Sequence, residues 1–197
     1  MQARRWMMVA VCTVLAPPAI LFGQAGAAPA AAPAQFSPAE SLGALLSLTE
    51  SEVVSAAEAM PADKYDFAPP ATMGEFKGVR TFGAQVRHIA QANYSLLRAN
   101  GVPGAVDPKT LAGLTSKDDL VKALKDSYAY AHTVVNSLTA DNAFTSVAGP
   151  PPQWKATKAS MVAFMIEHSM DHYGQMVEYL RMNGIIPPAS RPGAGSM

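Results

Sequence analysis

The most constraining feature of this sequence is helical hydrophobic spacing in four long segments, which are separated by stretches rich in Pro and Gly. Apolar residues recur at every third or fourth position in residues 37–60, 81–100, 116–138 and 157–183, as on one face of an α-helix. No segment shows the strict alternation of a half-buried strand. Because four amphipathic helices without strands bury their apolar faces against one another, we expect an all-α four-helix bundle.

The ends of the predicted helices carry residues that start and stop helices. Ser37, followed by Pro38 and Glu40, has the pattern of a capping box. Ser116 can cap the third helix, and Gly184 follows the fourth. The core positions predicted from the spacing in the first three helices are Leu42, Leu45, Leu46, Thr49, Val53, Ala56, Met60, Phe82, Val86, Ile89, Asn93, Leu96, Leu120 or Val121, Leu124, Tyr128, Ala131, Val135 and Leu138.

The N-terminal residues have the composition of a secretory signal peptide. Arg4 and Arg5 precede the apolar residues 6–23, and the small residues 25–27 suit cleavage by a signal peptidase. An uncleaved membrane anchor is the alternative, which Pro17–Pro18 disfavours because adjacent prolines weaken a spanning helix.

We therefore predict a signal peptide over 1–27, an Ala/Pro linker over 28–36, the bundle over 37–188 and a flexible tail over 189–197. The protein would be exported to the periplasm or outside the cell, with no stable membrane anchor after cleavage. Its single cysteine, Cys12, lies within the predicted signal peptide. A mature chain without cysteine suits an oxidising compartment.

The charge balance argues against nucleic-acid binding. The chain has 15 basic and 15 acidic residues. Loss of Arg4 and Arg5 would leave 13 basic residues and a net charge of about −2. Because phosphate neutralisation needs clustered cations, and no run of Lys or Arg is present, we expect no nucleic-acid partner.

Two histidines on the predicted fourth helix are the first candidates for chemistry. His168 and His172 are four residues apart, so their side chains project from one face. Two such imidazoles can share a metal ion, or they can be hydrogen-bonded residues of the core or the helix surface. The spacing alone leaves both readings open. His88, beside the apolar face of the second helix, is the candidate for a third ligand.

Several catalytic classes are excluded by missing motifs. Glu167 precedes His168 instead of following it, so the zinc-peptidase motif HExxH is absent. The paired Glu-x-x-His motifs of di-iron bundles and the CxxCH motif of covalent haem are also absent. No GxSxG, P-loop or dinucleotide-binding motif appears.

Three segments together resemble the DinB family of metal-dependent four-helix bundles. These are RTFGAQVRHIAQANYSLLRANG, HSMDHYGQMVEYLRMNGIIPPAS and, before them, MPADKYDFAPP. The resemblance covers roughly residues 36–190. It implies that His88, His168 and His172 hold one divalent metal ion. Three imidazole ligands are compatible with zinc, nickel or iron.

Other polar residues have two readings each. Asp171 and Glu167 flank the histidines and are expected to be solvated helix charges, with orientation of an imidazole as the alternative. Gln175, one turn after His172, could line the pocket or pack between helices. His132 lies off the apolar stripe of the third helix, which predicts an exposed side chain, with lining of the site as the alternative.

The resemblance implies a metal-dependent transferase or hydrolase that acts on a small molecule, since some relatives are thiol-dependent transferases. The alternatives are a non-catalytic metal-stabilised bundle for partner binding or metal handling, and a bundle whose histidines bind no metal. The sequence identifies no substrate. It also leaves the oligomeric state open, with a homodimer among the states it allows.

Overall fold

The computed structural model describes residues 34–193. The predicted signal peptide, its cleavage site, most of the predicted linker and the end of the predicted tail lie outside the described residues. Within residues 34–193, no helix has both the length and the apolar character that crossing a membrane requires.

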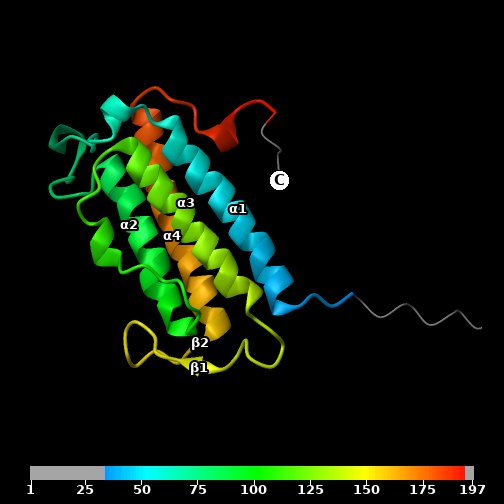
Figure 1. Ribbon diagram of the computed structural model, residues 1–197. Helices are drawn as coiled ribbons and strands as arrows, with labels where there is room; N and C mark the ends of the chain where they lie inside the picture. The colour runs from blue at the N-terminus through cyan, green and yellow to red at the C-terminus, as the bar shows by residue number, and fades with distance from the viewer. Residues whose placement is uncertain (1–33, 194–197) are drawn as a thin grey trace, which may run out of the picture. The chain divides into compact units, whose positions relative to one another are not determined.

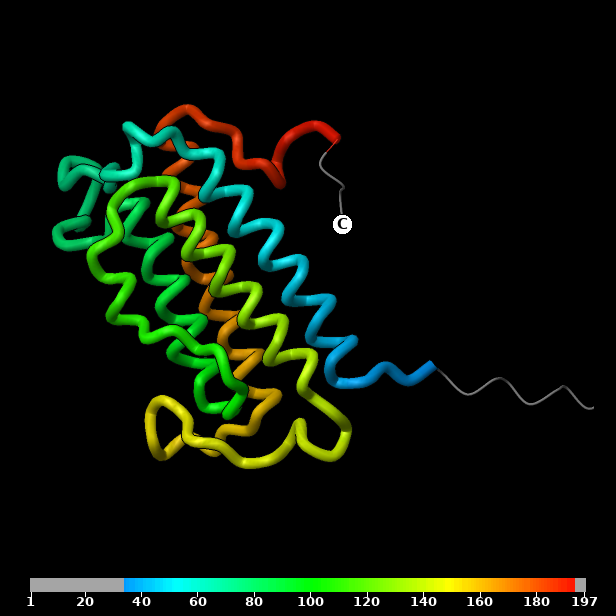
Figure 2. Tube along the Cα trace, in the orientation of Figure 1, coloured from blue at the N-terminus to red at the C-terminus, as the bar shows by residue number. Residues whose placement is uncertain are grey.

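Four long helices lie side by side (Figures 1 and 2). They are α1 (Pro38–Ala59), α2 (Phe82–Leu97), α3 (Lys117–Asn136) and α4 (Lys158–Met182). Helix α1 packs mainly against α3 and α4, and α2 packs against the same two helices. The expected all-α four-helix bundle is confirmed, with α2 and α4 as neighbours along their length.

The helix starts follow from local sequence. Ser37 Oγ accepts a hydrogen bond from the Glu40 N–H at 3.2 Å, and Glu40 Oε2 accepts one from the Ser37 N–H at 2.8 Å, so the predicted capping box is present. Thr157 caps α4 together with Ser160 in the same way. Helix α2 ends before a 3-10 turn and Gly101, whose φ of +74° is left-handed.

The buried side of each helix agrees with the predicted spacing at most positions. Leu45 is a wrong prediction, because its side chain is 52% exposed. The next residue, Leu46, was also predicted to be in the core and is fully buried, because adjacent residues of a helix do not face the same side. Leu96 is only half-buried, and Val134, which the spacing did not select, is fully buried.

The long connections contain short regular elements that the sequence analysis did not predict. Strands β1 (Ser146–Val147) and β2 (Ala156–Thr157) pair antiparallel just before α4. Two residues per strand are too few to show alternation. Short 3-10 helices are also present. The connections hold η1 (Ala62–Lys64), η2 (Ala71–Met73), η3 (Arg98–Asn100) and η4 (Pro108–Leu111), and η5 (Pro188–Ser190) follows α4.

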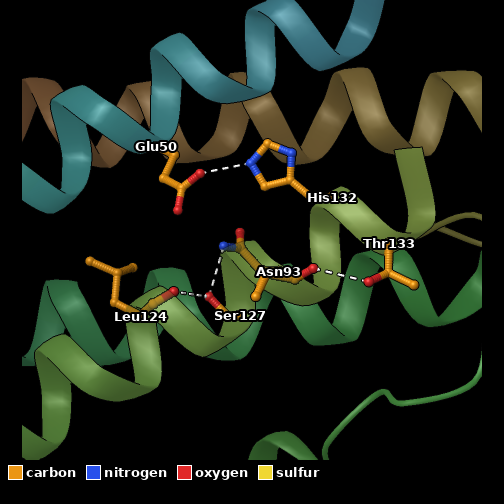
Figure 3. Close-up of polar contacts among 7 residues, drawn as sticks. Glu50, Asn93, Leu124, Ser127, His132 and Thr133 are labelled. Carbon is orange, nitrogen blue, oxygen red and sulfur yellow. Dashed lines mark hydrogen bonds and ion pairs between the residues drawn. The ribbon is translucent and has the colours of Figure 1, made fainter. Parts of the chain in front are cut away.

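A polar cluster lies among the apolar side chains of the bundle. Asn93 of α2 is fully buried, and its Nδ2 donates a hydrogen bond to Ser127 Oγ of α3 at 3.0 Å (Figure 3). Ser127 Oγ donates in turn to the Leu124 carbonyl at 2.7 Å. Ser169 of α4 donates to Asn93 Oδ1 at 3.4 Å. The cluster therefore joins three helices by directional bonds within the core.

Candidate metal centre

The structure brings His88 of α2 together with His168 and His172 of α4. One ring nitrogen from each lies within 4.8 Å of the other two. The Nε2 atoms of His88 and His168 are 3.2 Å apart. The ring centroids are separated by 5.1 Å for His88–His168 and by 4.7 Å for each of the pairs made with His172. Three imidazoles thus converge on one small volume between α2 and α4.

Burial keeps these imidazoles neutral near pH 7. The pKa of His88 is lowered from 6.5 to about 4, by burial first and then by the charges of Arg80 and the two other histidines. The pKa of His172 is also lowered to about 4, by burial and by His168. Burial lowers the pKa of His168, against the opposing charges of Asp171 and Glu167. Neutral imidazoles offer free lone pairs, which metal ligation requires.

The environment of His172 supports the fit to a metal ion. Its side chain is only 5% exposed, and its buried Nδ1 has no hydrogen-bond partner among the described residues. A buried imidazole with an unsatisfied nitrogen costs free energy. A cation on this group of three donors would offset that cost by occupying their lone pairs. The three histidines could therefore hold a metal ion.

A chain of amides joins the two helices beside the histidines. Gln85, one turn before His88, donates from Nε2 to Gln175 Oε1 at 2.6 Å. Gln175 Nε2 donates to Asp171 Oδ2 at 3.2 Å. Gln175 therefore bridges α2 and α4, and it does not line the pocket described below. Gln85, which is 1% exposed, was not predicted from the sequence. Its position on the apolar face of α2, three residues before a histidine, was the available signal.

The flanking acids do not orient an imidazole by a hydrogen bond. Among residues 34–193, neither Asp171 nor Glu167 has a hydrogen bond to His88, His168 or His172. Both carboxylates are exposed. The negative charges of Asp171 and Glu167 raise the pKa of His168, and that of Asp171 also raises the pKa of His172. In both histidines this effect opposes the lowering of the pKa by burial.

His132 lies outside this group. Its Nε2 is 2.7 Å from Glu50 Oε2, which pairs α3 with α1 (Figure 3). The His132 side chain is 33% exposed, so the prediction of an exposed residue was only partly right, because the carboxylate of α1 covers one side of the ring. His132 therefore offers a histidine of the same chain that does not belong to the candidate site.

A pocket of about 600 Å³ opens beside two of the three histidines. His88 and His168 line it, whereas His172 does not. Its other walls come from α2, from the crossover that contains η4, from the β1–β2 connection and from α4. The remaining lining residues are Gln91, Ala92, Ser95, Leu96, Pro108, Lys109, Ala112, Pro150 and Phe164.

The model of one protein family matches this sequence. The DinB superfamily model covers residues 45–176, more than half of the 197-residue chain. The chain belongs to the DinB superfamily. The matched region of this DinB superfamily member includes His88, His168 and His172, so the resemblance expected from the sequence is confirmed. A comparison with curated proteins found no match to this DinB chain.

Proposed function

We propose that this DinB superfamily member is an exported metal-dependent transferase or hydrolase that acts on a small molecule. His88, His168 and His172 would hold the metal ion. The observation that carries the proposal is the convergence of three imidazoles, two of which line an open pocket. Concave pockets with a few convergent polar groups are the usual form of small-molecule sites.

The ligand set favours a catalytic role for the ion over a purely structural one. Structural zinc sites use four protein ligands, whereas catalytic sites use three and leave a position open. A divalent ion would supply the Lewis acidity that activates a nucleophile, and the chain has no cysteine after residue 27 to act as one. Zinc, nickel and iron all accept imidazole nitrogen, and we propose one of these three.

The residues of the chain itself have separate tasks in this proposal. His88 and His168 face both the pocket and the third histidine, so an ion that they held would lie next to a bound molecule. His172, which is buried, would be the third ligand. The Gln85–Gln175 hydrogen bond keeps α2 and α4 in register at this level of the bundle, which fixes the separation of the ligands.

A non-catalytic metal-stabilised bundle is the second candidate. The unsatisfied Nδ1 of His172 favours it, because an ion that satisfies a buried group stabilises the fold whether or not it takes part in a reaction. Such a site would be closed to solvent. The two histidines on the pocket wall favour the catalytic proposal instead.

Metal content tests the site. The full chain would be purified without a histidine tag, as wild type and as His88→Ala, His168→Ala and His172→Ala, with His132→Ala as the matched control. We expect about one equivalent of metal in wild type and in the control, and little in the three site variants. A wild type that stays empty after exposure to zinc, nickel and iron would refute the metal site.

Activity and export need their own tests. Metal-loaded wild type would be screened with small thiol acceptors and esters beside the metal-free protein, and turnover that requires the ion would support the enzyme. N-terminal sequencing of the protein from the periplasm or medium should find a start near residue 28. A protein that stays in the cytoplasm with its first residues intact would contradict export.

A further inference from the structure

We propose that the pocket beside His88 and His168 binds a small molecule with a mainly apolar body and one anionic group. This molecule is the substrate if the proposed function is correct. The binding step itself needs only the walls of the pocket, so it can be tested without a metal ion.

The apolar body follows from the residues of the wall. Ala92 and Leu96 of α2, Phe164 of α4 and Pro150 of the β1–β2 connection present aliphatic and aromatic surface, together with Pro108 and Ala112. The volume of about 600 Å³ lies within the range for small-molecule sites. Removal of apolar ligand surface from water against this wall would provide most of the affinity.

The anionic group follows from the charges at the pocket. Among residues 34–193, no Asp or Glu lines it, and Lys109 is the only lining residue with a fixed charge. Lys109 forms no ion pair with the residues that the structure describes. The nearby Asp107 accepts a hydrogen bond from the Lys109 backbone N–H at 3.0 Å, where it caps η4. A cation without a partner at the wall of an apolar pocket favours a ligand of opposite charge.

Two hydrogen bonds fix the crossover that carries Lys109. Gln91 Nε2 of α2 donates to the Pro108 carbonyl at 3.0 Å. Arg87 of α2 donates to the Leu114 carbonyl at 2.8 Å. These bonds hold η4 against α2 on both sides of Lys109, so this wall of the pocket is formed before a ligand binds. A preformed wall lowers the entropy cost of binding.

The protein contains a fluorescent reporter of the pocket. The Trp154 ring packs edge-to-face on Phe164, with ring centroids 5.2 Å apart, and Phe164 lines the pocket. The other of the two tryptophans is Trp6. A full chain with Trp6→Phe therefore reports from Trp154 alone, and Trp154→Phe in the same chain should abolish the signal.

The test uses this single-tryptophan chain after treatment with a chelator. It would be titrated with 4-phenylbutanoate and with the uncharged 4-phenylbutanamide. We expect both to change Trp154 fluorescence, and the carboxylate to bind about two- to fivefold more tightly, as one solvated ion pair permits. Lys109→Ala should remove this preference, and Lys122→Ala, a matched exposed lysine outside the pocket, should retain it.

A blocking variant locates the binding. Ser95→Phe places a large side chain at an exposed position of α2 on the pocket wall, so it should weaken both ligands at least fivefold while the circular dichroism stays unchanged. Saturable binding that is unchanged in both Ser95→Phe and Lys109→Ala would overturn the proposal, as would the absence of any binding. Either failure leaves the metal measurement unaffected, so loss of the pocket proposal is distinct from loss of the metal site.

Discussion

At the scale of single residues, His88 and His172 combine burial with pKa values lowered from 6.5 to about 4. In the unfolded chain they would take up protons near pH 6.5, whereas in the folded metal-free protein they would do so only near pH 4. The unfolded state therefore binds more protons between these values. We predict that the free energy of unfolding of the metal-free protein falls as the pH decreases from about 6.5 to about 4.

Urea unfolding of chelator-treated protein across this pH window measures the effect. Carboxylate protonation also contributes, so the comparison is with the double variant His88→Gln, His172→Gln. Its stability should depend less steeply on pH than that of wild type. Equal slopes in wild type and the double variant would show that the two imidazoles are not held neutral.

Asn93 is the second residue with a predicted energetic role. Asn93→Ala should lower the free energy of unfolding by about 2–3 kcal/mol, because it leaves the hydroxyls of Ser127 and Ser169 without their amide partner and opens a cavity. Chemical denaturation gives the value. The exposed Asn136 of α3 is the control, and its replacement by Ala should change stability by less than about 0.5 kcal/mol. Similar effects at both positions would contradict a structural role for the cluster.

Some residues of the site can be predicted from the sequence and others cannot. His168 and His172 share a helix face by their spacing alone, and resemblance to the family placed His88 with them. Neither the spacing of the histidines nor the resemblance indicated Gln85 or Lys109, and only Gln85 had a local signal, its place on the apolar face of α2. The role of Gln85 depends on the register between α2 and α4, and that of Lys109 depends on how the crossover folds back over α2.

At the scale of elements, local signals explain what was predicted. The caps at Ser37 and Ser116 are contacts between residues three apart, so they can be predicted from the sequence. The β1–β2 pair cannot, because its two-residue strands form only when the connection closes. The prediction for Leu45 was wrong for a related reason, because the helices that pack against α1 determine which of its residues are buried.

At the same scale, we predict that replacing two helical glycines by alanine changes the free energy of unfolding in opposite directions. A Cβ at Gly83 of α2 would lie 3.0 Å from Tyr65 Cδ1, 3.2 Å from the Tyr65 carbonyl oxygen and 3.3 Å from Leu120 Cδ1. The Tyr65 ring cannot move freely, because its hydroxyl donates to the Ala57 carbonyl at 2.7 Å. Gly83→Ala should therefore destabilise the protein by about 1–2 kcal/mol.

Gly174 of α4 is the matched comparison. A Cβ there would meet nothing within 4 Å, so Gly174→Ala should stabilise the protein by about 0.5–1 kcal/mol through helix propensity. Thermal unfolding of both variants checks the pair. A stabilised Gly83→Ala would mean that α2 and the 61–80 connection are less tightly packed than the structure indicates.

At the scale of the whole molecule, the bundle was the most predictable feature. Its hydrophobic period is repeated over four helices, so single errors such as Leu45 do not change the fold class. The apolar core joins all four helices and includes fully buried Leu46, Ile89, Leu124 and Met176. Because this core does not depend on the histidines, the bundle should fold with or without an ion.

Metal removal tests that independence. We predict that chelation leaves the helical circular dichroism at room temperature unchanged and lowers the melting temperature. An ion at 100 times its dissociation constant adds about 2.7 kcal/mol, which corresponds to a shift of roughly 5–10 °C for a chain of this length. His132→Ala should show the same shift and His172→Ala none. Loss of helicity on chelation would instead mean that the ion holds the bundle together, which favours the non-catalytic metal-stabilised bundle over the enzyme.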